Sequence, residues 1–563
     1  MASQTVPSIC RNCLAYCPIL VTVEDGRAVK VAGDPEAPAF DGYTCPKGRA
    51  LPAQHNGPAR ILRCLARDAD GRFTEVAADT MLDDVAKRVR ALIDEHGPRS
   101  VAMYRGTGPV SHPVGAPLVR KFFRAIGSGM VFSAATIDKP AEHTSVALHG
   151  NWRAGLQSFE STDTWMVVGA NPIIAKSNGG PLNNPGMRLK EAVERGLKLI
   201  VIDPRRSETA RHAHVHLQAR PGEDPALLAG ILHVLLAEDL VDHDFVRANA
   251  QGLEALREAV RDYTPEWVAA RADVPVDAGI SQKVESLKYS GVSRGYPIPW
   301  GQYTPAVAQP PAGAELVDDA TFFFRLAQRM GLQLEWINPR GQGPNAEGPS
   351  PAIPLDMARV PTADEMVELS CRNSRIPLEE VKRHPHGHVW DLDVRVAPRE
   401  PDCTARLELG AARMMDELRQ LRAEVSPAVT DAEYPLQLLC RRANNFMNSV
   451  GQEMPQLARG ARLAPAAMHG TQLAALGLRE GDTVRIRSRH GTMRARVEAD
   501  DALRPGTVSV VHGFGAAATL ADADPELAEA SVNRLVGLDE RDPISGIPRM
   551  TGVAVVVEAL PQP

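Results

Sequence analysis

The chain has 563 residues, enough for several domains of about 100–200 residues each. Its formal net charge of −6 provides no overall basic field for nucleic acid or an anionic membrane surface. No window approaches the ~18 uninterrupted apolar residues of a membrane-spanning helix, so we expect neither a nucleic-acid partner nor a membrane span.

The beginning of the chain bears on its compartment. Residues 1–7 contain neither a charged segment nor an apolar run, and no twin arginine precedes the first cysteine. We therefore expect a cytoplasmic protein, whose reducing surroundings do not favour a disulfide framework. Four of the eight cysteines nevertheless fall within the first 45 residues, and this uneven placement predicts a local function.

The cysteine spacing near the N-terminus predicts an iron–sulfur cluster. Cys10, Cys13, Cys17 and Cys45 give the pattern C-x2-C-x3-C-x27-C. Three closely spaced thiolates can wrap one face of a cubane, and a distant fourth gives each iron of a [4Fe–4S] cluster one cysteine. Zinc is the main alternative, but zinc sites more often use two C-x2-C pairs, and the second pair is missing. Four unrelated buried thiols are the remaining alternative.

Residues 1–62 form the first predicted domain. It contains only short β-like runs, at 19–23 and 28–31. We expect its apolar core to be too small to be stable without a crosslink such as a metal centre. Lys47 follows Cys45 by two residues. It is either a solvated surface charge or a cation beside the cluster, where it would stabilise the reduced, more negative form.

Residues 63–278 form the second predicted domain, in which helical and strand patterns alternate. This alternation is typical of a parallel sheet covered by helices. The predicted elements are helices at 80–96, 187–195 and 227–236 and strands at 164–168 and 197–202.

The last two predicted domains differ in character. Residues 279–430 show few clear periods apart from helices at 321–330 and 411–424. Residues 431–563 are typical of a compact β-barrel, since short strands alternate with turn residues. Its predicted strands lie at 483–487, 492–497, 507–511 and 552–557. The fold class is therefore α/β, with a small N-terminal Fe–S domain, central parallel-sheet α/β domains and a C-terminal β-barrel.

Several short motifs follow one another over nearly the whole chain. They are Cys45-Pro46-Lys47-Gly48, Gly169-Ala170-Asn171-Pro172, Ile202-Asp203-Pro204-Arg205, Arg220-Pro221-Gly222-Glu223-Asp224, and barrel segments at 478–482, 512–515, 532–535 and 542–546. In this order they resemble the dimethyl-sulfoxide-reductase family of molybdopterin oxidoreductases, which includes formate dehydrogenases and nitrate reductases. The resemblance implies two molybdopterin guanine dinucleotides (bis-MGD) around one Mo or W ion, beside the [4Fe–4S] cluster.

The resemblance places one dinucleotide in the central domains. Ligands of open parallel sheets bind beyond the carboxyl ends of strands, where Asn171 and Asp203 lie. Asn171 can bond a pterin or phosphate, Asp203 a ribose hydroxyl or guanine nitrogen, and Arg205 and Arg220 phosphates. Alternatively, Asp203 caps a turn and Arg220 is a surface charge. Asp224 completes this predicted set.

The resemblance places the other dinucleotide in the barrel. Asn444, His512 and Asn533 are the candidate contacts there, although His512 could equally be a structural histidine. The predicted catalytic residues are Asp138, His143 and Lys47.

Family enzymes usually add one protein ligand to the metal from the region before the Gly-x-Asn-Pro loop. Residues 136–143 contain no cysteine there, and Asp138 is the candidate because a hard carboxylate suits a high-valent metal. Its alternative role is to pair with Lys139 or to begin a helix at Pro140. His143 is a candidate proton relay, because histidine titrates near neutrality.

The expected activity is that of a molybdenum or tungsten oxidoreductase acting on a small-molecule substrate. No G-x-G-x-x-G loop follows a strand, so electrons are expected to reach a separate redox partner protein or subunit. A non-catalytic iron–sulfur electron-transfer subunit and a non-redox hydratase or hydroxytransferase are the alternatives. The family pattern breaks near residue 278, which indicates an internally shortened chain and leaves its activity open.

Overall fold

The protein is described from a computed structural model that divides into two compact units. Unit 1 comprises Met1–Lys139 and Ile298–Leu392, and unit 2 comprises Pro140–Pro297 and Asp393–Pro563. Among the described helices, none is both long and apolar enough to cross a bilayer. The described residues are 3–13, 15–38, 40–58, 60–106, 114–134, 137, 140–149, 152–153, 162–176, 184–275, 300–337, 352–372, 374, 376–390, 397–398, 404, 406–424, 431–452, 454–459, 461, 463–515 and 528–560.

Unit 1 begins with an antiparallel sheet in the order β1 (Ser3–Ile9), β2 (Pro18–Glu24) and β3 (Arg27–Gly33). The predicted strands at 19–23 and 28–31 are confirmed. Asp25 and Gly26 connect them with φ angles of 49° and 81°, as a two-residue hairpin turn requires. Short helices α1 (Pro46–Arg49) and α2 (Leu51–His55) and the hairpin β4 (Cys64–Arg67)–β5 (Phe73–Val76) follow.

A helical layer forms the main apolar core of unit 1. Helices α3 (Ala78–His96) and α4 (Gly115–Ala125) both contact α13 (Asp319–Arg329), which lies about 200 residues further along the chain. Phe122 and Phe324 are almost fully buried in this core. The remaining elements of unit 1 are the pairs β6 (Met103–Arg105)–β7 (Val131–Ser133), β13 (Trp300–Gly301)–β16 (His388–Val389) and β14 (Glu335–Trp336)–β15 (Ile353–Pro354), with η1 (Pro98–Ser100), α14 (Ala363–Cys371) and α15 (Leu378–Lys382).

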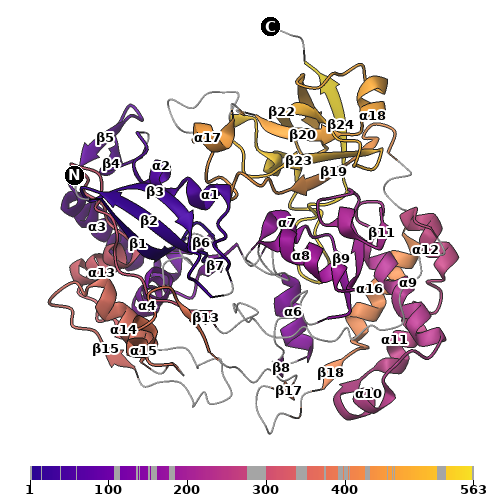
Figure 1. The fold of residues 1–563 in the computed structure, drawn as a ribbon, viewed down its shortest axis with the longest axis horizontal. Helices are drawn as coiled ribbons and strands as arrows, with labels where there is room; N and C mark the ends of the chain where they lie inside the picture. The colour runs from indigo at the N-terminus through magenta and orange to yellow at the C-terminus, as the bar shows by residue number, and fades with distance from the viewer. Residues whose placement is uncertain are drawn as a thin grey trace. The chain divides into compact units, whose positions relative to one another are not determined.

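Unit 2 contains the predicted parallel sheet. Its order is β11 (Val215–Leu217), β10 (Lys198–Ile202) and β9 (Thr164–Val168), with β10 in the centre. Because a parallel strand is covered on both faces, β10 is a continuous apolar run whose last four residues are buried. The predicted helices are confirmed (Figure 1): α8 (Pro185–Glu194) begins two residues and ends one residue earlier than the sequence predicts, and α9 (Asp224–Ala237) extends further at both ends.

Further helices pack against α9 and bury its apolar surface. They are α11 (Leu253–Val260), α12 (Pro265–Ala272) and α16 (Ala412–Ala423), which together with α9 enclose the buried ring of Tyr263. The shorter elements of unit 2 are α6 (Pro140–His149), α7 (Pro172–Ala175), α10 (His243–Asn249), α17 (Pro455–Ala458), α18 (Gly470–Ala475), η3 (Ala210–His212), η5 (Val532–Leu535) and the pairs β8 (Trp152–Arg153)–β17 (Ala397–Pro398) and β12 (Ala250–Gln251)–β18 (Leu407–Glu408).

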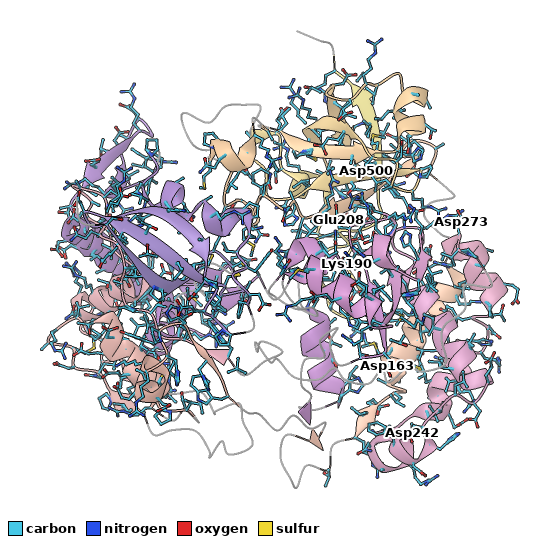
Figure 2. The ribbon with its side chains drawn as sticks, viewed as in Figure 1. Asp163, Lys190, Glu208, Asp242, Asp273 and Asp500 are labelled. Carbon is cyan, nitrogen blue, oxygen red and sulfur yellow. The ribbon has the colours of Figure 1, made fainter. Side chains whose placement is uncertain are left out.

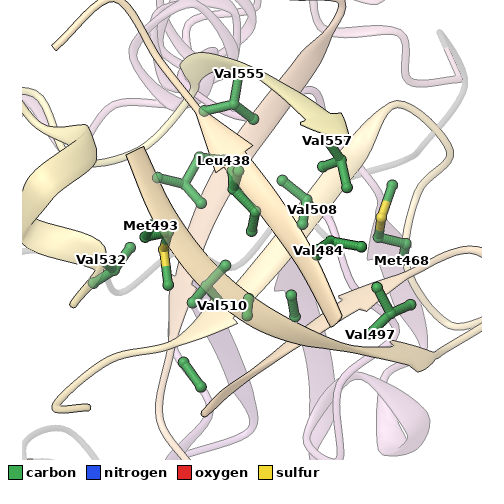
Figure 3. Close-up of a cluster of buried hydrophobic side chains, with 14 of the residues drawn as sticks. Leu438, Met468, Val484, Met493, Val497, Val508, Val510, Val532, Val555 and Val557 are labelled. Atoms are coloured by element: carbon green, nitrogen blue, oxygen red, sulfur yellow. The ribbon is translucent and has the colours of Figure 1, made fainter. Parts of the chain in front are cut away.

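The C-terminal part of unit 2 is a closed barrel, as the sequence predicts. Its strands follow the order β19-β23-β20-β22-β21-β24, with alternate side chains directed inward (Figure 3). Leu438, Val484 and Val508 are fully buried in its core. The strand bounds are β19 (Leu436–Arg441), β20 (Ala464–Met468), β21 (Thr483–Arg487), β22 (Thr492–Ala499), β23 (Thr507–Val511) and β24 (Val553–Ala559).

The barrel core generates a stability prediction. Leu438→Ala should lower the free energy of unfolding of the barrel by about 2–5 kcal/mol, because it removes buried methyl groups and leaves a cavity. Leu538→Ala is the matched control, since Leu538 is 77% exposed. Urea titration monitored by circular dichroism measures both variants, and equal midpoints would contradict the assigned core.

Candidate functional site

Three of the four cysteines in the predicted cluster motif lie at element boundaries, and Cys13 lies in the loop between β1 and β2. Cys10 directly follows β1, Cys17 directly precedes β2, and Cys45 is the residue before α1. The backbone N–H of Cys10 donates to the carbonyl of Cys17 at 2.8 Å and closes the loop that carries Cys13. Cys10, Cys17 and Cys45 are buried, and Cys13 is half-buried.

The thiols interact electrostatically with one another and with two neighbouring side chains. Burial, above all, raises the pKa of Cys10 to about 12, and Cys13 and Cys45 raise it further, whereas the Asn12 backbone N–H and Lys47 lower it. Burial and the charges of Cys45, Cys17 and Cys13 likewise raise the pKa of Tyr43. Without a metal, the Cys10 thiol therefore keeps its proton at neutral pH, and a metal must displace that proton to bind the thiolate.

The surroundings of the thiols fit an iron–sulfur cluster. Asn12 Nδ2 and Thr44 Oγ1 are buried donors without a hydrogen-bond partner. The sulfides of a cluster could accept hydrogen bonds from both. A Cβ on Gly48 would lie 2.3 Å from Thr44 Oγ1 and 3.4 Å from Cys10 Sγ, so only glycine leaves room there. Among the described residues, no three His, Cys, Asp or Glu side chains are placed as they would be around a single metal ion. A cubane differs from that arrangement, since each cysteine binds its own iron.

Lys47 is not a solvated surface charge. Only 7% of the residue is exposed, although it lies in the one-turn helix α1. Its charge lowers the pKa of Cys10, which means that the ammonium group acts on the thiol cluster. Sequence reasoning named Lys47 but missed Asn12, Tyr43 and Thr44, whose only available signal was their proximity to the cysteines in the chain.

In unit 2, polar side chains gather beyond the carboxyl ends of β9 and β10. The Asn171 amide donates to Glu208 Oε2 at 2.6 Å and accepts from the Thr209 hydroxyl at 2.8 Å. Asp203 Oδ1 accepts from the Arg205 backbone N–H at 2.8 Å, so Asp203 also caps a turn. The sheet therefore brings Asn171, Asp203 and Arg205 together, as the sequence predicts for neighbouring strand ends.

Arg205 is held by carboxylates from both parts of unit 2. Its Nη1 and Nη2 donate to the two oxygens of Glu208 at 3.0 and 3.3 Å, and its Nε donates to Asp500 Oδ2 at 2.7 Å. Asp500 belongs to the barrel, and Figure 2 shows it near Glu208 where the barrel meets the sheet. Arg205, which the sequence analysis assigns to a phosphate, is thus paired with two carboxylates, and the sequence analysis named neither of them.

Backbone contacts join the barrel to this same segment. The Arg206 N–H donates to the Ala502 carbonyl at 2.8 Å, and the Arg504 N–H donates to the Pro204 carbonyl at 3.0 Å. Arg504 also forms an ion pair with Asp273. Within unit 2, the strand ends of the sheet therefore lie directly against the barrel, so that one ligand could contact both.

Burial and pairing shift the two carboxyl groups in opposite directions. For Glu208, burial favours the protonated form, but hydrogen bonds from Arg205 and Asn171 and the Arg205 charge outweigh it and lower the pKa to about 2. For Asp203, burial dominates and raises the pKa to about 6. Asp203 can therefore donate as well as accept hydrogen bonds in mildly acidic solution, whereas Glu208 remains an anion.

Arg220 and Asp224 lie at the start of α9. Arg220 Nη1 donates to the Arg271 carbonyl at 3.2 Å, and its Nη2 lies 3.8 Å from Asp273. Burial, followed by the charge of Glu223, raises the pKa of Asp224. Glu223 itself is buried and accepts from Arg271 Nε at 2.6 Å, which makes this pair a structural anchor of the helical layer.

The barrel candidates are placed differently from one another. Asn444 Oδ1 accepts from Lys176 Nζ at 3.1 Å, and Lys176 follows α7, which begins beside Asn171. His512 Nδ1 lies 3.0 Å from the Arg441 carbonyl and Nε2 lies 3.0 Å from Asn448 Oδ1, so both ring nitrogens are engaged. Burial lowers the pKa of His512.

Three candidates are not brought into these clusters by the described residues. Asn533 is exposed on η5. Asp138 lies outside the described residues, and of His143 only the backbone, in α6, is described. Lys176 was missed by sequence reasoning, although it follows the Gly-Ala-Asn-Pro motif by only a few residues.

The raised pKa of Asp203 predicts a pH-dependent effect on stability. Its folded-state pKa of about 6 exceeds the ordinary 3.8, so the stability that its proton contributes is present below about pH 3.8 and is lost as pH rises through 6. Asp203→Asn, which mimics the protonated form, should therefore raise the free energy of unfolding by about 1–2 kcal/mol near pH 7.5. The gain should vanish at about pH 4.

Urea titrations at both pH values check this outcome. Asp244→Asn is the control, because the Asp244 side chain is 90% exposed. A destabilised Asp203→Asn variant at neutral pH would contradict the burial that we assign to this carboxyl.

Comparison with known families gives a consistent assignment along the chain. The Molybdopterin oxidoreductase family matches residues 60–480. The Molybdopterin oxidoreductase Fe4S4 domain matches residues 3–57, which include all four predicted cluster cysteines. The Molydopterin dinucleotide binding domain matches residues 436–554, which form most of the barrel.

Individual relatives agree with these matches. The F420-dependent formate dehydrogenase subunit alpha of Methanocaldococcus jannaschii is 27% identical over 62% of this chain and 49% of its own length. Formate dehydrogenase H of Escherichia coli is 30% identical over 61% and 47%, and the nitrate reductase of Symbiobacterium thermophilum is 33% identical over 46% and 36%. The chain thus spans at most about half the length of these relatives.

A solved structure also shares the fold. Acetylene hydratase from Pelobacter acetylenicus superposes with a TM-score of 0.69 at 16% identity, covering 99% of this chain and 100% of that one. Since the family match extends over residues 60–480, well over half of the sequence, the chain belongs to the molybdopterin oxidoreductases and carries their Fe4S4 and dinucleotide-binding domains.

Proposed function

We propose that this chain transfers electrons between a small-molecule substrate at a Mo or W ion, held by bis-MGD, and its [4Fe–4S] cluster. The observation that carries the proposal is that cofactor-binding domains match at both ends of one chain. The metal would exchange an oxo group, a hydride or electrons with the substrate, while the protein supplies binding and orientation. A partner protein or subunit would receive or supply the electrons.

The chain's own residues have distinct tasks in this proposal. Cys10, Cys13, Cys17 and Cys45 hold the cluster, and the buried ammonium of Lys47 stabilises its reduced state by charge. The donors Asn12 Nδ2 and Thr44 Oγ1 would hydrogen-bond to cluster sulfur. These contacts would make electron acceptance more favourable than it is in an apolar pocket.

Residues of unit 2 would orient the dinucleotides. Asp203 and Asn171 present amide and carboxyl groups to a guanosine, and Arg205 and Arg220 are the proposed phosphate contacts. Because Arg205 is already bonded to Glu208 and Asp500, a phosphate would have to join or replace one of these carboxylates. The other proposed contacts are Asp224, Asn444, His512 and Asn533.

The substrate is proposed to be a small anion. Relatives are named for formate, nitrate, thiosulfate and arsenate, all of which belong to this class. Asp138 remains the proposed metal ligand and His143 the proposed proton relay. The proposed compartment is the cytoplasm, where cluster thiols stay reduced. Domain boundaries at 62, 278 and 430 also remain proposals.

The cluster ligands can be tested one at a time. Cys13→Ser should abolish the low-temperature EPR signal of the reduced protein, because a hydroxyl is a much poorer iron ligand than a thiolate. Cys64→Ser is the matched control, since Cys64 lies in the hairpin strand β4, outside the cysteine motif. An unchanged signal in Cys13→Ser would show that the ligand set is wrong.

A dye-linked assay tests the activity itself. The anaerobically purified chain should reduce oxidised viologen dye with formate, or oxidise reduced dye with nitrate, because electrons leave through the cluster in the first case and enter through it in the second. Cys13→Ser should lose this activity. Substrate turnover that continues at full rate without any electron carrier would instead support the hydratase alternative, and a cluster without turnover on any small anion would support a carrier subunit.

A further inference from the structure

A fully buried carboxylate lies at the junction of the cysteine-bearing loops in unit 1. Asp34 directly follows β3 and is 0% exposed. Its backbone N–H donates to the carbonyl of Pro18 at 3.3 Å, one residue beyond the cluster cysteine Cys17. Its carboxylate oxygen Oδ1 accepts the Glu36 N–H at 3.0 Å and holds the turn that follows. A charge so deeply buried requires a partner.

The same turn leads to the fourth cysteine. A Cβ on Gly33 would lie 1.8 Å from the Gly42 carbonyl oxygen, so the strand end and the loop before Cys45 touch through their backbones. Tyr43, in that loop, interacts electrostatically with the cluster thiols. A displacement of Asp34 would therefore be transmitted to the loops of both Cys17 and Cys45.

The partner of Asp34 comes from a distant segment of the chain. His386 Nδ1 lies 2.8 Å from Asp34 Oδ2, and its Nε2 lies 3.6 Å from Glu36 Oε2. The rings of Phe40 and Trp300 pack with centroids 5.3 Å apart, and a Cβ on Gly387, next to His386, would lie 2.6 Å from Trp300 Nε1. The segment that carries His386 thus covers the outside of the turn that joins the two cysteine loops.

Other histidines of this segment have different surroundings. His384 and His388 stack on each other at 4.4 Å, and His384 lies 3.5 Å from Glu380. In the described part of unit 1, neither His384 nor His388 forms a hydrogen bond or ion pair with Asp34. The His384 side chain is 32% exposed and that of His386 is 26% exposed, which makes His384 a matched control.

We propose that His386 is a positioning residue of the iron–sulfur centre: its Nδ1–H donates to the buried Asp34 carboxylate, which offsets part of the carboxylate charge and fixes the loops of Cys17 and Cys45. The proposal rests on the electron-transfer function proposed above. Reduction adds negative charge to the cluster, so an unbalanced carboxylate nearby disfavours it. Loss of His386 should therefore lower the midpoint potential.

The test uses the full chain with its cluster reconstituted anaerobically. Redox titration followed by low-temperature EPR compares the parent with His386→Leu, His386→Asn, His384→Leu and the double variant Asp34→Asn/His386→Leu. His386→Asn retains an N–H donor, and the double variant removes the charge that His386 balances.

The expected result is a more negative potential and an altered spectrum in His386→Leu alone. His386→Asn and His384→Leu should remain close to the parent, and the double variant should return toward it. If His386→Leu loses the cluster and the double variant regains it, the proposal is equally supported.

An intact cluster of unchanged potential in His386→Leu would overturn the inference while leaving the proposed function in place. A cluster lost in both His386→Leu and the double variant would also overturn it, since removing the charge would then not help. A parent chain that takes up no iron would remove the proposed function, and this inference with it.

Discussion

The N-terminal domain must hold several buried thiols together with little apolar core of its own. Cys10, Cys17 and Cys45 lie next to β1, β2 and α1, respectively, and burial raises the pKa of Cys10, so its thiol keeps its proton until a metal replaces it. Binding of a cluster therefore converts a costly arrangement of buried polar groups into four covalent cross-links. A negative cluster would also stabilise the buried Lys47 side chain and give the Asn12 and Thr44 donors an acceptor.

A second constraint operates where the barrel meets the parallel sheet of unit 2. Backbone hydrogen bonds bring barrel residues 500–504 against the loop after β10, and Arg205 is held by carboxylates from both sides. This arrangement keeps the guanidinium in place before any ligand arrives, which would reduce the entropy cost of binding the proposed phosphate. The opposite pKa shifts of Glu208 and Asp203 show that burial alone does not determine charge in this cluster.

The sequence predicts the local elements well and the long-range contacts poorly. Strands such as β9 and β21 are rich in β-branched residues bounded by turns, and their predicted bounds are confirmed. Strand β20 was missed because Ala464–Met468 is alanine-rich and contains a proline; it forms because β22 and β23 pair with it on both sides. The contact of Asp34 with His386 spans 352 residues and has no local signal. The cluster motif, in contrast, could be predicted because three of its four cysteines lie close together along the chain.

The account depends on both cofactors being present in this one chain, which is shorter than its relatives. Elemental analysis of anaerobically purified protein, combined with acid release of guanine nucleotide, tests this most directly. The account predicts about four irons per chain and about one Mo or W accompanied by two guanine nucleotides. Iron without guanine nucleotide would contradict the enzyme, and a chain that contains neither would contradict the whole assignment.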